Sequence, residues 1–246
     1  PPRSTGKGSS EASEVYKGQG LVSLAQLRDI YINYYSFDLY EQAWEDIDTG
    51  AIAVQKIVDK GDAAYGINTG FGLLAQTRVE DDQLALLQRN LVLSHCTGVG
   101  KLIDSAAVRL IIALKVISLS QGHSGVRSSV VELLISFYHE DILPCIPSKG
   151  SVGASGDLAP LAHLAAALIG VGEVHYKGQL MTASQAMNQA GLNALELGPK
   201  EGLALLNGTQ TSTALALAGL FETENLFAAA LVTGALSVDA MKGSTV

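Results

Sequence analysis

The chain has 246 residues and a formal net charge of −8, and this length allows one large domain or two smaller ones. Hydrophobic residues make up 48% of it and charged residues only 16%. Helices of this composition should bury much of their surface, either inside a large domain or against other subunits. The acidic balance and the lack of a Lys/Arg-rich run argue against a nucleic-acid partner, which requires clustered basic residues.

The sequence also predicts where the folded part begins and in which compartment it works. Residues 1–20 are rich in Gly, Ser, Glu and Lys, which predicts a disordered tail or an expression remnant. The longest apolar stretch, 158–171, is interrupted by Pro160 and is shorter than the about 20 residues that span a bilayer. Cys96 and Cys145 are too few for a disulfide framework. We therefore expect a cytoplasmic protein with reduced thiols that binds no membrane.

Helical periodicity dominates the rest of the chain. Ser23 precedes apolar residues at helical spacing and should cap the first helix, as Thr182 should cap a later one. A short hairpin is expected over 173–179, turning at Lys177 and Gly178. Further helices are predicted over residues 46–60, 81–95, 105–120, 128–140, 158–169, 182–190, 200–206 and 212–241.

Two irregular stretches, 65–72 and 143–157, separate these helices because each contains several glycines or prolines. The predicted fold class is mainly α. A mostly helical N-terminal domain with irregular loops is expected over 21–121, and the first part of a long helical bundle over 122–246. The chain stops directly after a helical run with no polar taper, so we expect this bundle to be truncated.

The most informative segment is the glycine-rich stretch 150–161, which contains Ser155. A hydrolase nucleophile elbow would need Gly where the chain has Asp157. A phosphate-binding loop would need a Gly-Lys-Ser/Thr sequence, which is missing. From the pattern alone, the favoured interpretation is a helix N-cap in which Ser155 or Asp157 opens the following helix.

The same twelve positions resemble the signature of the aromatic amino-acid ammonia-lyases and aminomutases. This resemblance implies that Ala154, Ser155 and Gly156 cyclise to 4-methylideneimidazol-5-one, with Asp157 as a supporting residue. The amide nitrogen of Gly156 would attack the carbonyl carbon of Ala154, and loss of two waters would leave a methylidene electrophile. Nearby glycines would permit the sharp backbone bend. The cofactor is thus expected to be self-derived, with no external cofactor and no metal.

A second motif of the resemblance is the loop 65–72, which begins at Tyr65 and ends at Gly72. The resemblance implies that Tyr65 is an acid/base group at the substrate's β-carbon or amine, which requires a phenol shifted toward ionisation. Gly72 would support the loop. The structural alternative for Tyr65 is a packed loop aromatic.

A third motif covers 200–210 and contains Asn207. The resemblance implies that Asn207 donates a hydrogen bond to the substrate carboxylate or to the imidazolone oxygen, with Gln210 in a supporting role. The structural alternative is that Asn207 terminates a helix before Gly208.

Ser94 and His95, at the end of the predicted helix 81–95, resemble the histidine branch of the family. The resemblance implies that His95 contacts the substrate imidazole, and that ammonia is eliminated from L-histidine to give trans-urocanate. A tyrosine lyase or an aminomutase of the same family is an alternative, as is an inactive fragment or assembly partner. His163, on the helix after the tripeptide, is expected to be a hydrogen-bonded core histidine.

The resemblance covers the chain from Leu21 to Val246, and it matches the N-terminal half of the family's chains. It implies a homotetramer of full-length chains whose active sites draw residues from several subunits. The expected ligand is a small amino-acid substrate. The segment by itself is expected to be catalytically crippled, because the family's carboxylate-binding arginine lies in the other half.

Overall fold

Helices dominate the computed structural model of the chain, which describes residues 22–70, 78–153 and 155–244. This confirms the prediction of a mainly α chain. The predicted tail over 1–20, Gly72 and Ala154 lie outside the described residues. The helices are α1 (Leu24–Ile32), α2 (Glu41–Lys60), α3 (Leu84–His95), α4 (Ser105–Leu119), α5 (Ser128–His139), α6 (Leu158–Leu168), α7 (Ala183–Ala190), α8 (Glu201–Leu206) and α9 (Gln210–Ala240).

The predicted helix caps are confirmed. The hydroxyl of Ser23 accepts from the backbone N–H of Gln26 at 3.3 Å, and the Gln26 side-chain oxygen accepts from the Ser23 N–H at 2.9 Å. Thr182 and Gln185 repeat this reciprocal arrangement at the start of α7. Such a capping box satisfies two of the backbone N–H groups that a helix start otherwise leaves without partners.

Two helix starts differ from the predictions by three residues or more. Helix α2 begins at Glu41, five residues before the predicted start, because Ala43 and Ile47 lie one turn apart on its buried face. The predicted helix over 81–95 starts as a 3-10 turn, η2 (Asp81–Gln83), before α3.

Short strands connect several of the helices. β1 (Val99–Leu102) pairs antiparallel with β3 (Pro147–Lys149), and β2 (Leu143–Pro144) joins the hairpin of β4 (Glu173–Tyr176) and β5 (Gln179–Thr182). The hairpin turns at Lys177 and Gly178 as predicted. The other three strands were missed because two to four residues are too few to reveal alternation in the sequence.

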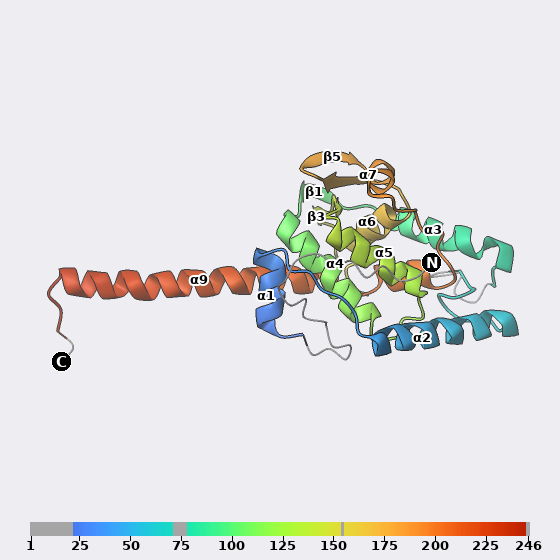
Figure 1. Cartoon of the computed structure of the whole chain (residues 1–246), viewed down its shortest axis with the longest axis horizontal. Helices are drawn as coiled ribbons and strands as arrows, with labels where there is room; N and C mark the ends of the chain where they lie inside the picture. Colours follow the sequence, from blue (N-terminus) through green and yellow to red (C-terminus); the bar gives the residue numbers. More distant parts are fainter. Residues whose placement is uncertain (1–21, 71–77, 154, 245–246) are drawn as a thin grey trace.

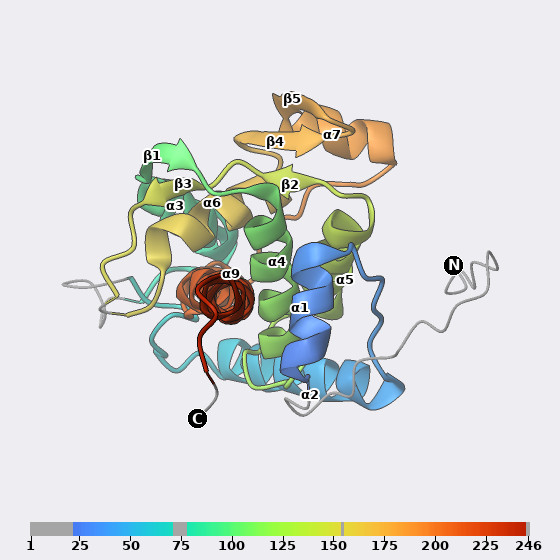
Figure 2. The same ribbon diagram turned by 90° about the vertical axis from the view of Figure 1, so that its left-hand side faces the viewer.

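Helix α4 lies at the centre of the body and packs against α1, α5 and α9 (Figure 2). The side chains of Leu110, Ile111 and Ile112 are fully buried there. One core cluster joins residues from both sides of position 121. The domain division between 121 and 122 stays a prediction.

Helix α9 begins inside the body and then projects far beyond it (Figure 1). Ala214 and Phe221 are buried, and the Arg28 guanidinium lies over the Phe221 ring and pairs with Glu224. Beyond Glu224 the helix exposes large apolar side chains, including Leu226, Phe227, Leu231, Val232, Leu236, Val238 and Met241. By length and composition, the stretch Glu201–Ala240 could cross a membrane, and its most apolar part is almost wholly exposed. A helix that is apolar on all sides is usually enclosed by other helices or by lipid.

Candidate functional site

The stretch that contains Ser155 touches the corner between α8 and α9 through two glycines. Gly156 has φ +105°, and a Cβ there would lie 2.4 Å from the Gly208 carbonyl oxygen. The backbone N–H of Asp157 donates to that same oxygen at 2.7 Å. Only glycine fits at position 156, and its φ supplies the bent backbone that the predicted cyclisation needs. Ser155, next to it, is exposed.

Asp157 ties this stretch to the first turn of α9. Its carboxylate is buried and accepts from the Ser151 hydroxyl at 2.7 Å, from the Ser212 backbone N–H at 2.7 Å and from the Ser212 hydroxyl. Asp157 occupies the N-cap position of α6, but its side chain caps no N–H of that helix. The N-cap interpretation is therefore wrong for its carboxylate, which acts between segments 55 residues apart.

His95 is the last residue of α3, and its ring is held by that helix. Nδ1 lies 2.8 Å from the Leu91 carbonyl oxygen and 3.2 Å from the Ser94 hydroxyl. A carbonyl can only accept, so Nδ1 carries the proton and donates to it. In the neutral ring Nε2 is then the acceptor. The half-buried His95 side chain can thus offer an acceptor to a ligand N–H.

The segment after His95 packs on the stretch that precedes Ser155. A Cβ at Gly150 would lie 3.1 Å from the Gly98 Cα, so the two backbones are in close contact. The Gly98 N–H donates to Nε2 of His163 at 3.3 Å. Burial lowers the pKa of His163, which favours the neutral ring that this hydrogen bond requires. His163 is hydrogen-bonded as predicted, but it is half-buried and not fully inside the core.

The loop of Tyr65 packs on α8 through Gly66 and Leu203. A Cβ at Gly66 would lie 2.3 Å from Cδ2 of Leu203. Gln88, fully buried on α3, donates to the Gly66 carbonyl at 3.4 Å and accepts from the Leu203 N–H at 3.2 Å. The Tyr65 side chain is 59% exposed. Gln88 was not identified from the sequence as a residue of this site. Its helical phase with the buried Leu84, Leu91 and Val92 was a signal that its side chain is buried.

Asn207 and Gln210 flank the corner between α8 and α9. Asn207 terminates α8, its backbone N–H donates to the Leu203 carbonyl at 2.8 Å, and its side chain is exposed. Asn207 is thus the predicted helix terminator, and its side-chain amide is also accessible to a ligand beside Gly208. Gln210 instead points its side-chain oxygen to Nζ of Lys115 at 3.3 Å.

Lys115, on α4, is a second residue that sequence reasoning missed. It is 1% exposed, and Nζ also donates to the carbonyl oxygens of Ala204 at 2.9 Å and Asn207 at 3.5 Å. Burial lowers the pKa of Lys115 to about 7, while the charge of Asp157 opposes that change. A lone lysine in the apolar run 110–119 was the available signal, because a buried charge needs partners.

Lys115 should make the folding free energy depend on pH. Its pKa is about 7 in the folded chain against 10.5 for the ordinary side chain, so between these values the unfolded chain binds a proton that the folded chain does not. The free energy of unfolding should therefore rise from pH 7 toward pH 10.5 through this group. Denaturant titrations of wild type and Lys115→Met across that range measure it. If the two proteins differ in their free energy of unfolding by the same amount at every pH, the expectation is contradicted.

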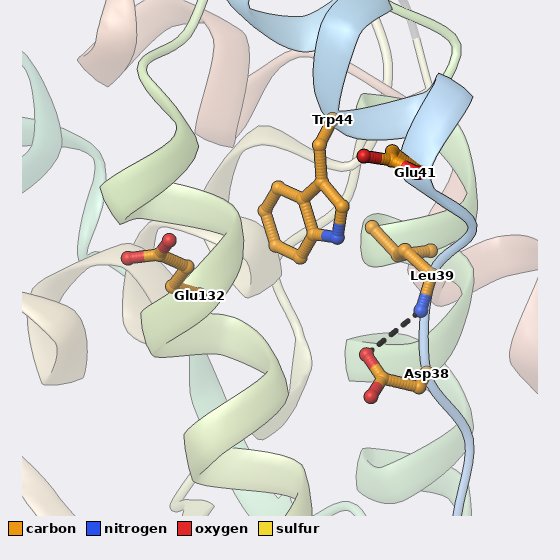
Figure 3. Close-up of a pocket in the computed structure, with 5 residues that line it drawn as sticks. All are labelled: Asp38, Leu39, Glu41, Trp44 and Glu132. Carbon is orange, nitrogen blue, oxygen red and sulfur yellow. Dashed lines mark hydrogen bonds between the residues drawn. The ribbon is translucent and has the colours of Figure 1, made fainter. Parts of the chain in front are cut away.

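A separate hollow of about 460 Å³ lies between the start of α2 and α5. Figure 3 shows its lining, in which the Trp44 ring lies between α2 and Glu132, and Asp38 accepts from the Leu39 N–H at 2.9 Å. It contains none of the predicted site residues. Within the described ranges, no group of three His, Cys, Asp or Glu side chains could hold a metal ion.

The motifs identified in the sequence are thus brought together around the α8–α9 corner. The comparisons with known proteins agree with this arrangement. The family described as aromatic amino acid lyase matches residues 22–246. Histidine ammonia-lyase of Shewanella woodyi is 55% identical over 225 residues, which are 92% of this chain and 44% of that protein. The chain therefore spans less than half the length of this relative.

Solved structures agree. Phenylalanine aminomutase of Pantoea agglomerans is similar with a TM-score of 0.88 and 31% identity, over 94% of this chain and 44% of that one. Histidine ammonia-lyase of Trypanosoma cruzi gives a TM-score of 0.84 and 30% identity, over 91% and 44%. Because the family match covers every residue that the structure describes, the chain belongs to the aromatic amino acid lyase family.

Proposed function

We propose that this chain is the N-terminal active-site portion of an enzyme that eliminates ammonia from L-histidine to give trans-urocanate. The observation that carries the proposal is the 55% identity to a histidine ammonia-lyase over 92% of the chain. The exposed Ser155 and Asn207 and the half-buried His95 lie on segments that pack around the α8–α9 corner. Of these three, Ser155 belongs to the tripeptide that would supply covalent catalysis, and the other two would bind the substrate.

The residues around Ser155 fit the cyclised tripeptide that the family uses. A 4-methylideneimidazol-5-one formed from Ala154, Ser155 and Gly156 would supply an electrophile. Gly156 permits the required bend with φ +105°, and the Asp157 N–H fixes the backbone next to it by donating to Gly208. Asp157 accepts from three donors, so its position is set before any substrate binds. This supports the self-derived cofactor as a proposal.

Each remaining predicted residue has a role that its position supports. His95 would accept the N–H of the substrate imidazole at Nε2, because its Nδ1 proton is engaged with Leu91. The exposed Asn207 amide would donate to the substrate carboxylate. Tyr65, exposed beside α8, would move a proton at the substrate's amine or β-carbon.

Replacing His95 should weaken histidine recognition selectively. In His95→Phe the substrate imidazole N–H loses its acceptor, so kcat/KM for L-histidine should fall by about 10- to 100-fold. The test uses the parent polypeptide, meaning the longest natural product that carries this sequence. His175→Phe is the matched control, since His175 is exposed on β4. Equal losses in the two variants, or none in His95→Phe, would contradict the assignment.

An aminomutase is the second candidate function. The observation that favours it is the TM-score of 0.88 with a phenylalanine aminomutase. The two reactions share the electrophile but differ in product. Incubating the parent polypeptide with L-histidine, L-tyrosine and L-phenylalanine in turn separates them: ammonia and urocanate support the lyase, and a β-amino acid supports the aminomutase. No product from any of the three would contradict both.

We also propose that α9 is covered by copies of the same chain in a homotetramer. Phe227, Leu231 and Met241 are 65%, 61% and 84% exposed, and single soluble chains seldom expose so long an apolar surface. The first part of α9 packs inside the body against α4, so a cover of further helices continues the surroundings in which this helix begins. We propose separately that the protein works in the cytoplasm, because free cysteines such as Cys96 and Cys145 are typical of a reducing compartment.

Light scattering on the parent polypeptide tests the assembly. A mass of four chains is expected, and Leu231→Glu should lower it, because a buried charge without a partner disfavours helix packing. A wild-type monomer in solution, or partition of the wild type into detergent micelles or vesicles, would contradict the proposed tetramer.

A further inference from the structure

We propose that Lys115 is a positioning residue that fixes the α8–α9 corner against Gly156 and thereby sets the geometry in which the tripeptide reacts. The effect of Lys115 on the reaction of the tripeptide rests on the proposed function, whereas the contacts of Lys115 do not depend on it. Lys115 itself is buried inside the body and touches neither the substrate nor the reacting atoms. Its effect passes through the corner residues 207–210.

The first step is the match between donors and acceptors at Nζ. The Lys115 ammonium has three N–H donors and no acceptor, and the neutral amine that forms above its pKa of about 7 keeps two of those donors. Its three neighbours are the carbonyl oxygens of Ala204 and Asn207 and the side-chain oxygen of Gln210, at 2.9, 3.5 and 3.3 Å. All three acceptors belong to the end of α8 or the start of α9, while Lys115 belongs to α4. The side chain therefore clamps the corner to the central helix.

The second step is the need of this corner for outside donors. Asn207 leaves the helical conformation at φ −86° and ψ 116°, and Gly208 follows at φ +156°. The last carbonyls of a helix have no partners within it, and a buried carbonyl without a donor is costly. Lys115 supplies donors that the local sequence does not.

The third step is the contact between the corner and the tripeptide. The Gly208 carbonyl oxygen accepts from the Asp157 N–H at 2.7 Å and lies where a Cβ of Gly156 would be. A Cβ on Gly208 would lie 2.3 Å from the same Gln210 oxygen that accepts from Lys115. The contacts therefore run in series from Lys115 through Gln210 and Gly208 to Gly156. Because no space is left between the two backbones, a shift of the corner would also move Gly156.

Variants of Lys115 in the parent polypeptide test this role. Lys115→Met keeps the length and apolar stem but removes every donor, whereas Lys115→Arg keeps the charge and several donors. Leu110→Ala is the control, since Leu110 is equally buried on α4 but lies on the other side of that helix at 3.6 residues per turn. It removes packing from the same element without touching the corner contacts.

Two readouts are measured on each protein: hydrogen exchange of peptides that contain Asp157 and Ser212, and the fraction of molecules two waters lighter than the sequence. Lys115→Met should exchange at least about tenfold faster at those peptides and show a lower dehydrated fraction. Lys115→Arg should restore both in part. Leu110→Ala should keep wild-type values of both even if its unfolding midpoint falls.

The outcomes separate this inference from the proposed function. Wild-type exchange and dehydration in Lys115→Met would overturn the role of Lys115, and so would equal changes in Leu110→Ala. If the wild-type protein is not dehydrated at all, the proposed function fails. The exchange rates then still decide whether Lys115 holds the corner.

Discussion

Ser155→Ala should abolish ammonia release from L-histidine in the parent polypeptide while leaving its fold intact. Without the Ser155 hydroxyl, the second water cannot be lost and no methylidene carbon forms. Covalent catalysis contributes several orders of magnitude to the rates of such enzymes, so kcat should fall by about 10³-fold or more. Ser155 is exposed, so its replacement by alanine should change the stability by less than about 0.5 kcal/mol.

The measurement is ammonia and urocanate release, together with the thermal unfolding midpoint. Ser151→Ala is the matched control: it removes a nearby hydroxyl that donates to Asp157 at 2.7 Å, and it should lower stability but keep the electrophile. Wild-type turnover in Ser155→Ala would exclude the self-derived electrophile. Loss of the folded state in that variant would contradict the exposed position of the side chain.

Glu201→Ala should cause the largest loss of stability among single substitutions near the site. The Glu201 side chain is 2% exposed. It accepts from the Arg127 N–H at 3.0 Å, from Nε and Nη2 of Arg127 at 2.8 and 2.7 Å, and from the Gly198 N–H at 2.6 Å. Removing this carboxylate leaves those donors without their acceptor, so the free energy of unfolding should fall by about 3 kcal/mol.

Denaturant unfolding of the parent polypeptide checks this value. Glu201→Gln keeps one acceptor oxygen and should lose less. Asp62→Ala removes one member of the ion pair between Lys60 and Asp62, whose side chains are 74% and 64% exposed. The free energy of unfolding should therefore change by less than about 1 kcal/mol. Similar losses in Glu201→Ala and Asp62→Ala would mean that the Arg127–Glu201 pair contributes no more than a surface ion pair.

The features that local sequence determines were predictable. The caps at Ser23 and Thr182 depend on residues three positions away, and the hairpin turn at Lys177 and Gly178 depends on adjacent ones. Because the residues that cause each cap or turn lie within a few positions of it, the pattern can be recognised in a single sequence. The resemblance placed Ser155, His95 and Asn207 on segments that pack together, although their catalytic roles stay predictions.

The features that depend on distant partners were not predictable in the same way. Gln88 bonds with Leu203 at a separation of 115 residues, and Lys115 bonds with Ala204 at 89. The sequence can indicate that each of these polar side chains is buried, but it does not show which distant residue each one contacts. Asp157 shows how local reasoning fails: its position suits an N-cap, but its carboxylate binds Ser212, 55 residues away. Tertiary packing decides such pairings, and it leaves no periodic signal.

The intact mass of the purified parent polypeptide tests the central claim most directly. We expect a species two waters lighter than its sequence, with the loss confined to the peptide that contains Ser155 and Gly156. A mass that matches the unmodified sequence would contradict the self-derived electrophile, and with it the proposed elimination of ammonia.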